Sequence, residues 1–315
     1  MLQYDALEVA RTIGEPKDPR KPYPQLVSML CDTDTADPEE YVYYFDAIQD
    51  TDKIYVITSN GAVTQENVSP DTPAALTFVD LATPEYYIKL TDYVSRKENV
   101  LARKNATINR ALNSYETYKI VTLLAAAASS SGNQNTLGSG FTRFSFPHLI
   151  DMLEQVQDYG DNYKLVLGAT CWKDLKLWNW NDNKYQSITE AFADLHIEDI
   201  KLSLAGAASQ VSIDADNSGG VVATDMLGAT KAYLVAKDTE MGSPLLFVRK
   251  KLDSLKQLGG FIFENGDQPE RLVSVSPNPI SVVSGSRYLA IGVTGYEQIA
   301  CACVNQFSIS EFTRV

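Results

Sequence analysis

One short segment has the residue types and the spacing of a calcium-binding loop. Residues 214–219 have the sequence DADNSG, and a further aspartate follows eleven residues after the first. Oxygen ligands at positions 1, 3, 5 and 12, with glycine at position 6, are the pattern of a helix–loop–helix calcium site. The candidate ligands are Asp214, Asp216, Ser218 and Asp225.

Two features weaken the calcium hypothesis. The residues before this segment are typical of a loop and a strand rather than a helix, and position 12 holds Asp where a longer Glu usually supplies two oxygens. The alternative is a turn rich in Asp and Asn that binds no metal. Calcium is the one cofactor that the sequence suggests.

Other chemistry has little support in the sequence. His148 and His196 are the two histidines, and neither lies near a Ser or Cys motif that marks a nucleophile. The Gly-x-Ser-x-Gly and Gly-x-Gly-x-x-Gly motifs are absent. The cysteines are too few and too scattered for a disulfide framework or a zinc site, so we expect them to act as small buried apolar residues. They are Cys31, Cys171, Cys301 and Cys303, and the last two alternate on a predicted strand and share a face.

Composition and charge exclude several classes of protein. The chain has 315 residues, of which 44% are hydrophobic and 21% charged, enough for one large core or two modest ones. It shows neither a signal peptide nor a membrane-spanning run, so we expect a soluble intracellular protein. Its 40 acidic and 27 basic residues give a net charge of −13, which argues against direct recognition of nucleic acid.

The elements that would position these residues begin with a long helix. Residues 97–129 contain neither Gly nor Pro and are rich in strong helix formers. Apolar residues recur along this segment at helical spacing, which predicts one buried stripe. They are Leu101, Ile108, Leu112, Tyr115, Leu123 and Leu124.

The N-terminal segment combines extension signals with apolar side chains. Four prolines between Pro16 and Pro24 exclude a helix or a central strand there. The apolar side chains that follow need burial, and we expect an extended arm that lies on a neighbouring surface. The alternative is a disordered tail. These side chains are Leu26, Val27, Met29 and Leu30.

Strand patterns then lead to a projecting loop. The runs YVYYFDAI, KIYVIT and AVTQENV are strand-like, and Asn60-Gly61 between the last two is a strong hairpin signal. The chain returns through ALTFVDL and YYIKLTDYV. The tip has too few apolar residues to fold as a domain, so we expect it to project.

An α/β region and a β-rich end follow the long helix. We expect a helix from Ser145, a buried strand in YKLVLGA, a short helix capped by Thr170, and a strand in KAYLVAK. The last segment contains the runs PLLFVRK, GGFIFEN and RYLAIGVTGYEQIACACV, which are typical of a covered sheet.

This order of elements resembles the major capsid protein of tailed bacteriophages, whose fold encapsulins and the herpesvirus capsid floor share. The resemblance covers nearly the whole chain and implies an α+β fold with a peripheral and an axial domain. Its implied segments are an N-terminal arm at 1–45, an extended β loop at 46–95, a spine helix and the start of the peripheral domain at 96–144, the axial domain at 145–245, and closing strands of the peripheral domain at 246–315.

The resemblance also implies a function and partners. The chain would self-assemble into hexamers and pentamers of an icosahedral head that encloses double-stranded DNA, with scaffold, portal and decoration proteins as further partners. It would contact DNA non-specifically, assemble in the host cytoplasm and end in the virion capsid. Some relatives carry an N-terminal scaffolding segment, but here the arm-like sequence begins at Met1, so we expect a separate scaffold or none. Neither Lys53 nor Lys89 matches the cross-linking chemistry of some relatives, so we predict no cross-links.

Two alternatives remain open from the sequence. An encapsulin-type cellular shell would have the same fold with a different cargo. An α/β enzyme or binding protein would need to assemble its site from distant residues, since no catalytic motif is present.

Overall fold

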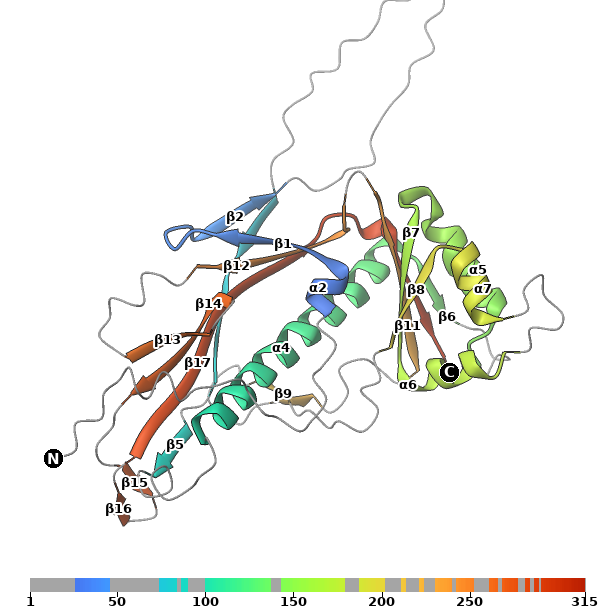
Figure 1. Cartoon of the computed structure of the whole chain (residues 1–315). Coiled ribbons are helices and arrows are strands. Elements are labelled where there is room, and N and C mark those ends of the chain that lie inside the picture. Colours follow the sequence, from blue (N-terminus) through green and yellow to red (C-terminus); the bar gives the residue numbers. More distant parts are fainter. Residues whose placement is uncertain are drawn as a thin grey trace, which may run out of the picture.

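The computed structural model describes residues 26–45, 74–83, 86–89, 100–136, 143–178, 187–201, 211–213, 221–223, 230–239, 242–251, 261–265, 268–276, 281–283, 286–288 and 290–314. Within these residues two larger sheets lie at different places along one long helix (Figure 1). The mixture of helices and strands confirms the expected α+β class. The Asn60-Gly61 turn and Lys53 lie outside the described residues, so the projecting hairpin stays a prediction.

The first sheet is organised around the 14-residue strand β17 (Ala290–Cys303). One edge of β17 pairs with β4 and β5, and its other edge pairs first with β14 and then with β12. β13 extends the sheet beyond β14, and β1 runs parallel to β12 at the opposite margin. The other strands are β1 (Cys31–Ala36), β4 (Val79–Ala82), β5 (Tyr86–Lys89), β12 (Leu245–Lys250), β13 (Phe261–Asn265) and β14 (Gln268–Ser276).

The long helix α4 (Val100–Ser131) confirms the helix expected over 97–129. Its 32 residues correspond to a rod of about 48 Å. Three members of the expected stripe, Ile108, Leu112 and Leu124, are buried, whereas Tyr115 and Leu123 are partly buried. α4 lies across the first sheet and reaches the second (Figure 1), and so it packs against both.

Strand β12 shows why the first sheet needs cover on both faces. Leu245 and Phe247 belong to the core beneath α4, whereas Val248 and Leu246 pack on the other face. That other face is covered by the antiparallel pair of β2 (Val42–Phe45) and β3 (Ala74–Thr77). The strict alternation follows from the period of two in a strand.

The second sheet has the strand order β6-β18-β11-β7-β8. Every residue from Ala232 to Ala236 of its central strand is buried, because α4 covers one face and α5 covers the other. Figure 1 shows α5 and α7 on the side away from α4. The elements are β6 (Gln134–Thr136), α5 (Phe146–Val156), β7 (Asn162–Leu167), α6 (Ala169–Lys176), α7 (Ile188–Asp194), β8 (Ile197–Lys201), β11 (Lys231–Lys237) and β18 (Ile309–Thr313).

The remaining elements are short. Two single helical turns lie at η1 (Gln157–Tyr159) and η3 (Gln306–Ser308). Two small antiparallel pairs stand apart from the main sheets. They are β9 (Val211–Ile213) with β10 (Val221–Ala223), and β15 (Ser281–Val283) with β16 (Ser286–Tyr288).

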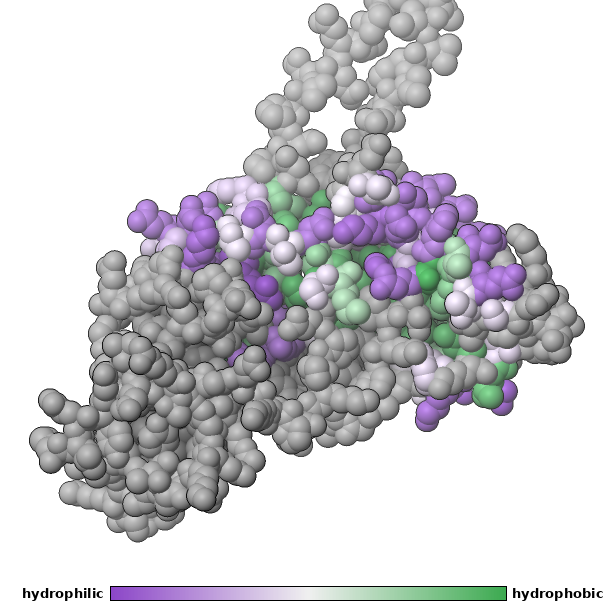
Figure 2. All heavy atoms as spheres, in the orientation of Figure 1, coloured by the Kyte–Doolittle hydropathy of each residue, from purple (hydrophilic) through white to green (hydrophobic). Residues whose placement is uncertain are grey.

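The structure corrects the expectation for the apolar residues after the prolines. They form the helix α2 (Leu26–Leu30), and Leu26, Val27 and Leu30 are buried in the core of their own chain against α4. The prediction that a neighbouring surface buries them is therefore wrong for these three. Met29 is 42% exposed, and Figure 2 shows apolar surface around this helix between more hydrophilic side chains.

Two smaller expectations are also wrong. The final strand β18 pairs with β11 and β6 in the second sheet, so residues 246–315 do not all complete the first sheet. The helix α6 begins at Ala169 with Gly168 as its N-cap, so Thr170 lies inside the helix instead of capping it. The boundaries of the five segments stay predictions.

Candidate functional site

The candidate calcium ligands Asp214, Asp216, Ser218 and Asp225 lie outside the described residues. The described strands on either side of residues 214–220 are β9 and β10, which pair antiparallel. The described residues directly before this segment form the strand β9, which agrees with the departure noted in the sequence. Among the described residues, no three His, Cys, Asp or Glu side chains lie close enough together to hold a metal ion. Calcium binding stays a prediction.

Both histidines have structural positions. The Nδ1 of His148 accepts a hydrogen bond from the backbone N–H of Ser145 at 3.1 Å, which holds the start of α5, and its ring packs on Phe312. Burial lowers the pKa of His148, although the charge of Asp151 acts in the opposite direction. His196 has a positive φ of 51° after α7, and its carbonyl accepts from the N–H of Tyr163 in β7.

The four cysteines are free thiols with raised pKa values. Burial is the first cause at each of them, and it raises the pKa of both Cys171 and Cys303 to about 12. A thiolate nucleophile needs the opposite shift. Cys301 and Cys303 both pack against the core beneath α4, which confirms that they share a face.

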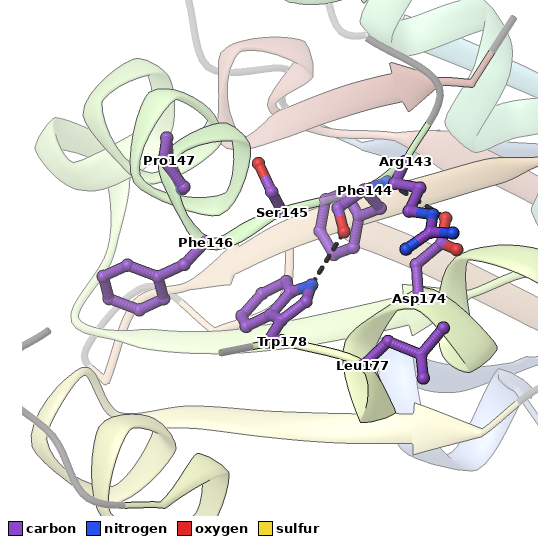
Figure 3. Close-up of a pocket in the computed structure, with 8 residues that line it drawn as sticks. All are labelled: Arg143, Phe144, Ser145, Phe146, Pro147, Asp174, Leu177 and Trp178. Carbon is purple, nitrogen blue, oxygen red and sulfur yellow. Dashed lines mark hydrogen bonds between the residues drawn. The ribbon is translucent and has the colours of Figure 1, made fainter. Parts of the chain in front are cut away.

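A small pocket lies where α5 begins and α6 ends (Figure 3). Its polar groups mostly bond within the chain. Trp178 Nε1 donates to the carbonyl of Phe144 at 2.7 Å, and Asp174 accepts from the N–H of Phe144 at 3.0 Å. Asp174 also forms an ion pair with Arg314 at 3.1 Å. With a volume of about 230 Å³, the pocket is smaller than typical small-molecule sites of about 300–1,000 Å³. The ion pair joins α6 to the residue that follows the C-terminal strand β18.

A second polar region is the junction where the chain crosses between the two sheets. We define it as residues 30–32, 132–133, 237–239, 242–244 and 304–309. Asp32 of β1 accepts from the N–H of Ser243 at 2.7 Å, and it pairs with Lys237 Nζ at 3.3 Å. The hydroxyl of Ser243 donates to the carbonyl of Leu30. One carboxylate thus holds both ends of the turn between β11 and β12.

Two further segments run through the junction: residues 132–133 follow α4, and residues 304–309 follow β17. Hydrogen bonds connect them to their neighbours. The N–H of Val304 donates to the carbonyl of Pro244 at 2.7 Å. The side-chain amide of Asn133, which follows α4, donates to the carbonyls of Phe307 and Ile309 at 3.2 Å each. Each of the three segments that run through the junction is therefore hydrogen-bonded to another of them or to β1. The junction can hold the two sheets in one relative orientation.

A buried ion pair links α4 to the first sheet. Arg249 of β12 donates through Nε and Nη2 to the same carboxylate oxygen of Glu116, at 3.1 and 2.7 Å. The Glu116 side chain is 4% exposed. A pair this deeply buried orients α4 on the sheet more than it stabilises the fold.

Comparison with known proteins gives the same architecture. No family model matches the chain, and no curated protein matches it in sequence. Among solved structures, the capsid structure of cyanophage P-SCSP1u is similar with a TM-score of 0.60 and 11% identity, covering 99% of this chain and 92% of that one. A structure from Mycobacterium phage Adephagia covers 99% and 98% at a TM-score of 0.55 and 10% identity. The chain has the phage capsid fold.

A third match supports the same fold. The capsid of an empty GTA particle has a TM-score of 0.52 and 8% identity, and the match covers 94% of this chain and 92% of the other. At the junction, described hydrogen bonds connect segments that run from one sheet to the other.

Sequence reasoning did not find the junction. Asp32, Lys237 and Ser243 lie up to 211 positions apart, so no local pattern connects them. Gly242, three residues before β12, is a local signal, because a glycine in a short connection between two strands indicates a turn with positive φ. Its φ is 85°.

Proposed function

We propose that this chain is the major capsid subunit of a tailed bacteriophage. It assembles into the hexamers and pentamers of an icosahedral head that encloses double-stranded DNA. The observation that carries the proposal is the fold shared with phage capsid structures over nearly the full length of both chains. A match of this extent includes both sheets and α4, rather than one common submotif.

The physical properties of the chain suit a structural role. Identical subunits close into rings when two different surfaces fit head-to-tail. A net charge of −13 keeps packaged DNA from adhering strongly to the wall. The described histidines and cysteines are committed to turns, caps and cores, so we propose a shell protein and not an enzyme.

The proposal includes partners and a location. Copies of the chain itself are the main partners, and scaffold, portal and decoration proteins are further ones. DNA contacts are non-specific, assembly takes place in the host cytoplasm, and the product is the virion capsid. None of the helices in the described part of the chain is long and apolar enough to span a membrane.

Size-exclusion chromatography followed by negative-stain microscopy tests the proposal. The purified chain, alone or expressed with its neighbouring genes, should elute as large particles that appear as closed shells. If it elutes as a monomer or a small oligomer under both conditions, the shell function is wrong. Nucleic acid inside particles purified from cells separates a phage head from a cargo shell, which would hold protein.

A further inference from the structure

The turn between β11 and β12 carries the chain from the second sheet to the first. It is closed by two backbone hydrogen bonds of 3.1 Å between Asp238 and Gly242, one in each direction. Lys237 is the last residue of β11, and Ser243 lies two residues before β12. The conformation of this turn therefore sets the direction in which one sheet leaves the other.

Asp32 reaches this turn from a strand more than two hundred residues away in sequence. Its Oδ2 accepts from the N–H of Ser243, and its Oδ1 accepts from Nζ of Lys237. A Cβ at Gly242 would clash with Oδ2 of Asp32, and the φ of +85° there also favours glycine. The turn and the carboxylate are thus fitted to each other.

The energies of these contacts suggest that they set the geometry of the turn and contribute little to the stability of the fold. The side chains of Lys237 and Asp32 are 43% and 48% exposed, and an ion pair so accessible to water contributes little. The bond from Ser243 N–H has a charged acceptor and a donor residue that is buried, so it is the stronger of the two. The large buried core beneath α4 supplies the stability of the contact between the sheets.

We propose that Asp32 is a positioning residue that fixes the angle between the two sheets by clamping the β11–β12 turn. This inference rests on the proposed shell function, in which it sets the curvature of the assembled subunits. Small angular differences between subunits prevent identical interfaces from closing into one ring. A subunit without this clamp should therefore build shells of mixed size.

The test compares Asp32→Ala with Asp34→Ala. Asp34 is a matched control because it lies two residues along the same strand and accepts from the hydroxyl of Tyr43 in β2, within the first sheet and its cover. Spin labels on Glu154→Cys in α5 and Ala82→Cys in β4, both exposed positions, report the distance between the sheets. Labelling of the protein without these two cysteines measures the reactivity of the native thiols, which burial keeps low.

In free subunits, Asp32→Ala should broaden the distribution of label-to-label distances, whereas Asp34→Ala should leave it as in the unchanged chain. In assembled particles, Asp32→Ala should replace one diameter class with several by cryo-electron microscopy. An unchanged distance distribution in Asp32→Ala would overturn the proposal.

A second variant covers the case in which Asp32→Ala does not fold. Asp32→Asn keeps an oxygen for the N–H of Ser243 and removes the charge that faces Lys237, so it should broaden the distribution less. If Asp32→Asn also keeps the distribution of the unchanged chain while Asp32→Ala is unfolded, Asp32 acts in stability and the proposal fails. Because the distances are measured in free subunits, they decide the role of Asp32 even if the unchanged chain forms no shells.

Discussion

Single polar side chains inside this subunit act mainly as connectors between elements. Asp32 holds a turn, Asp174 joins α6 to the C-terminal strand, and Glu116 joins α4 to β12. Each is an acidic residue whose partner lies far away in the sequence. Burial of Asp174 and Glu116 is tolerated because the partner offsets the cost of removing the charge from water.

Replacing Glu116 with Gln should destabilise the subunit strongly. The change leaves the Arg249 guanidinium half-buried beside a neutral amide, and removing one member of a buried pair costs about 3–5 kcal/mol. Urea-induced unfolding would measure the loss of unfolding free energy. The double variant Glu116→Leu with Arg249→Met is the control and should lose much less, since no charge stays behind. Equal losses in both variants would contradict this account.

The stability of the subunit should decrease as the pH is lowered, because of the titration of His148. Burial lowers its pKa in the folded state, so below about pH 6.5 the unfolded chain binds the proton first and unfolding is favoured. Protonation would also remove the Nδ1 acceptor used by the N–H of Ser145. His148→Asn keeps an acceptor oxygen near that position and should show a flatter profile between pH 6.5 and 5 in thermal melts. Parallel profiles for the two proteins would exclude this role.

Local sequence patterns predicted which helices and strands are present better than they predicted which neighbours each of them pairs with. The long helix, the strand in KAYLVAK and the helix after Ser145 are all present, because each has a strong period or a clear cap. The pairing of β18 with β11 in the second sheet was missed. A strand pattern indicates that a segment pairs with another strand, but it does not indicate which one. The choice of partner depends on contacts between residues far apart in the sequence.

Gly295 of β17 lies against Ile108 of α4. A methyl group at this position would clash with Cγ2 of Ile108. Gly295→Ala should therefore lower the unfolding free energy by about 1–3 kcal/mol through overpacking. Ile108→Ala removes the clashing group, so the double variant should lose less than the sum of the two single losses. Additive losses in urea unfolding would show that the two residues are not coupled.

Truncation of the N-terminal segment tests the corrected role of α2. Deleting residues 1–36 removes α2 and β1, and with them four buried side chains of the core beneath α4, those of Leu26, Val27, Leu30 and Cys31. The shortened subunit should lose its cooperative thermal transition. Met29→Ser on the exposed side of α2 should change stability by less than about 0.5 kcal/mol. A cooperative melt of the deletion variant would show that the subunit folds without α2 and β1 and would contradict this account.

For the whole molecule, the order of elements was enough to predict the fold, whereas the junction was not predictable. An arm, a β loop, a long helix, an α/β region and closing strands are ordered features that a single sequence displays. The junction depends on Asp32, Asn133 and Ser243, whose hydrogen-bond partners lie 174 or more positions away in the sequence. The candidate calcium ligands have the correct spacing, but spacing alone does not establish a metal site.

Cryo-electron microscopy of particles formed by the full chain tests the central claim most directly. The account predicts closed icosahedral shells in which hexamers and pentamers repeat one subunit, with both sheets and α4 fitting the density in the orientation described. A chain that yields no closed particles, or shells whose density cannot hold the two sheets on either side of the junction, would contradict it.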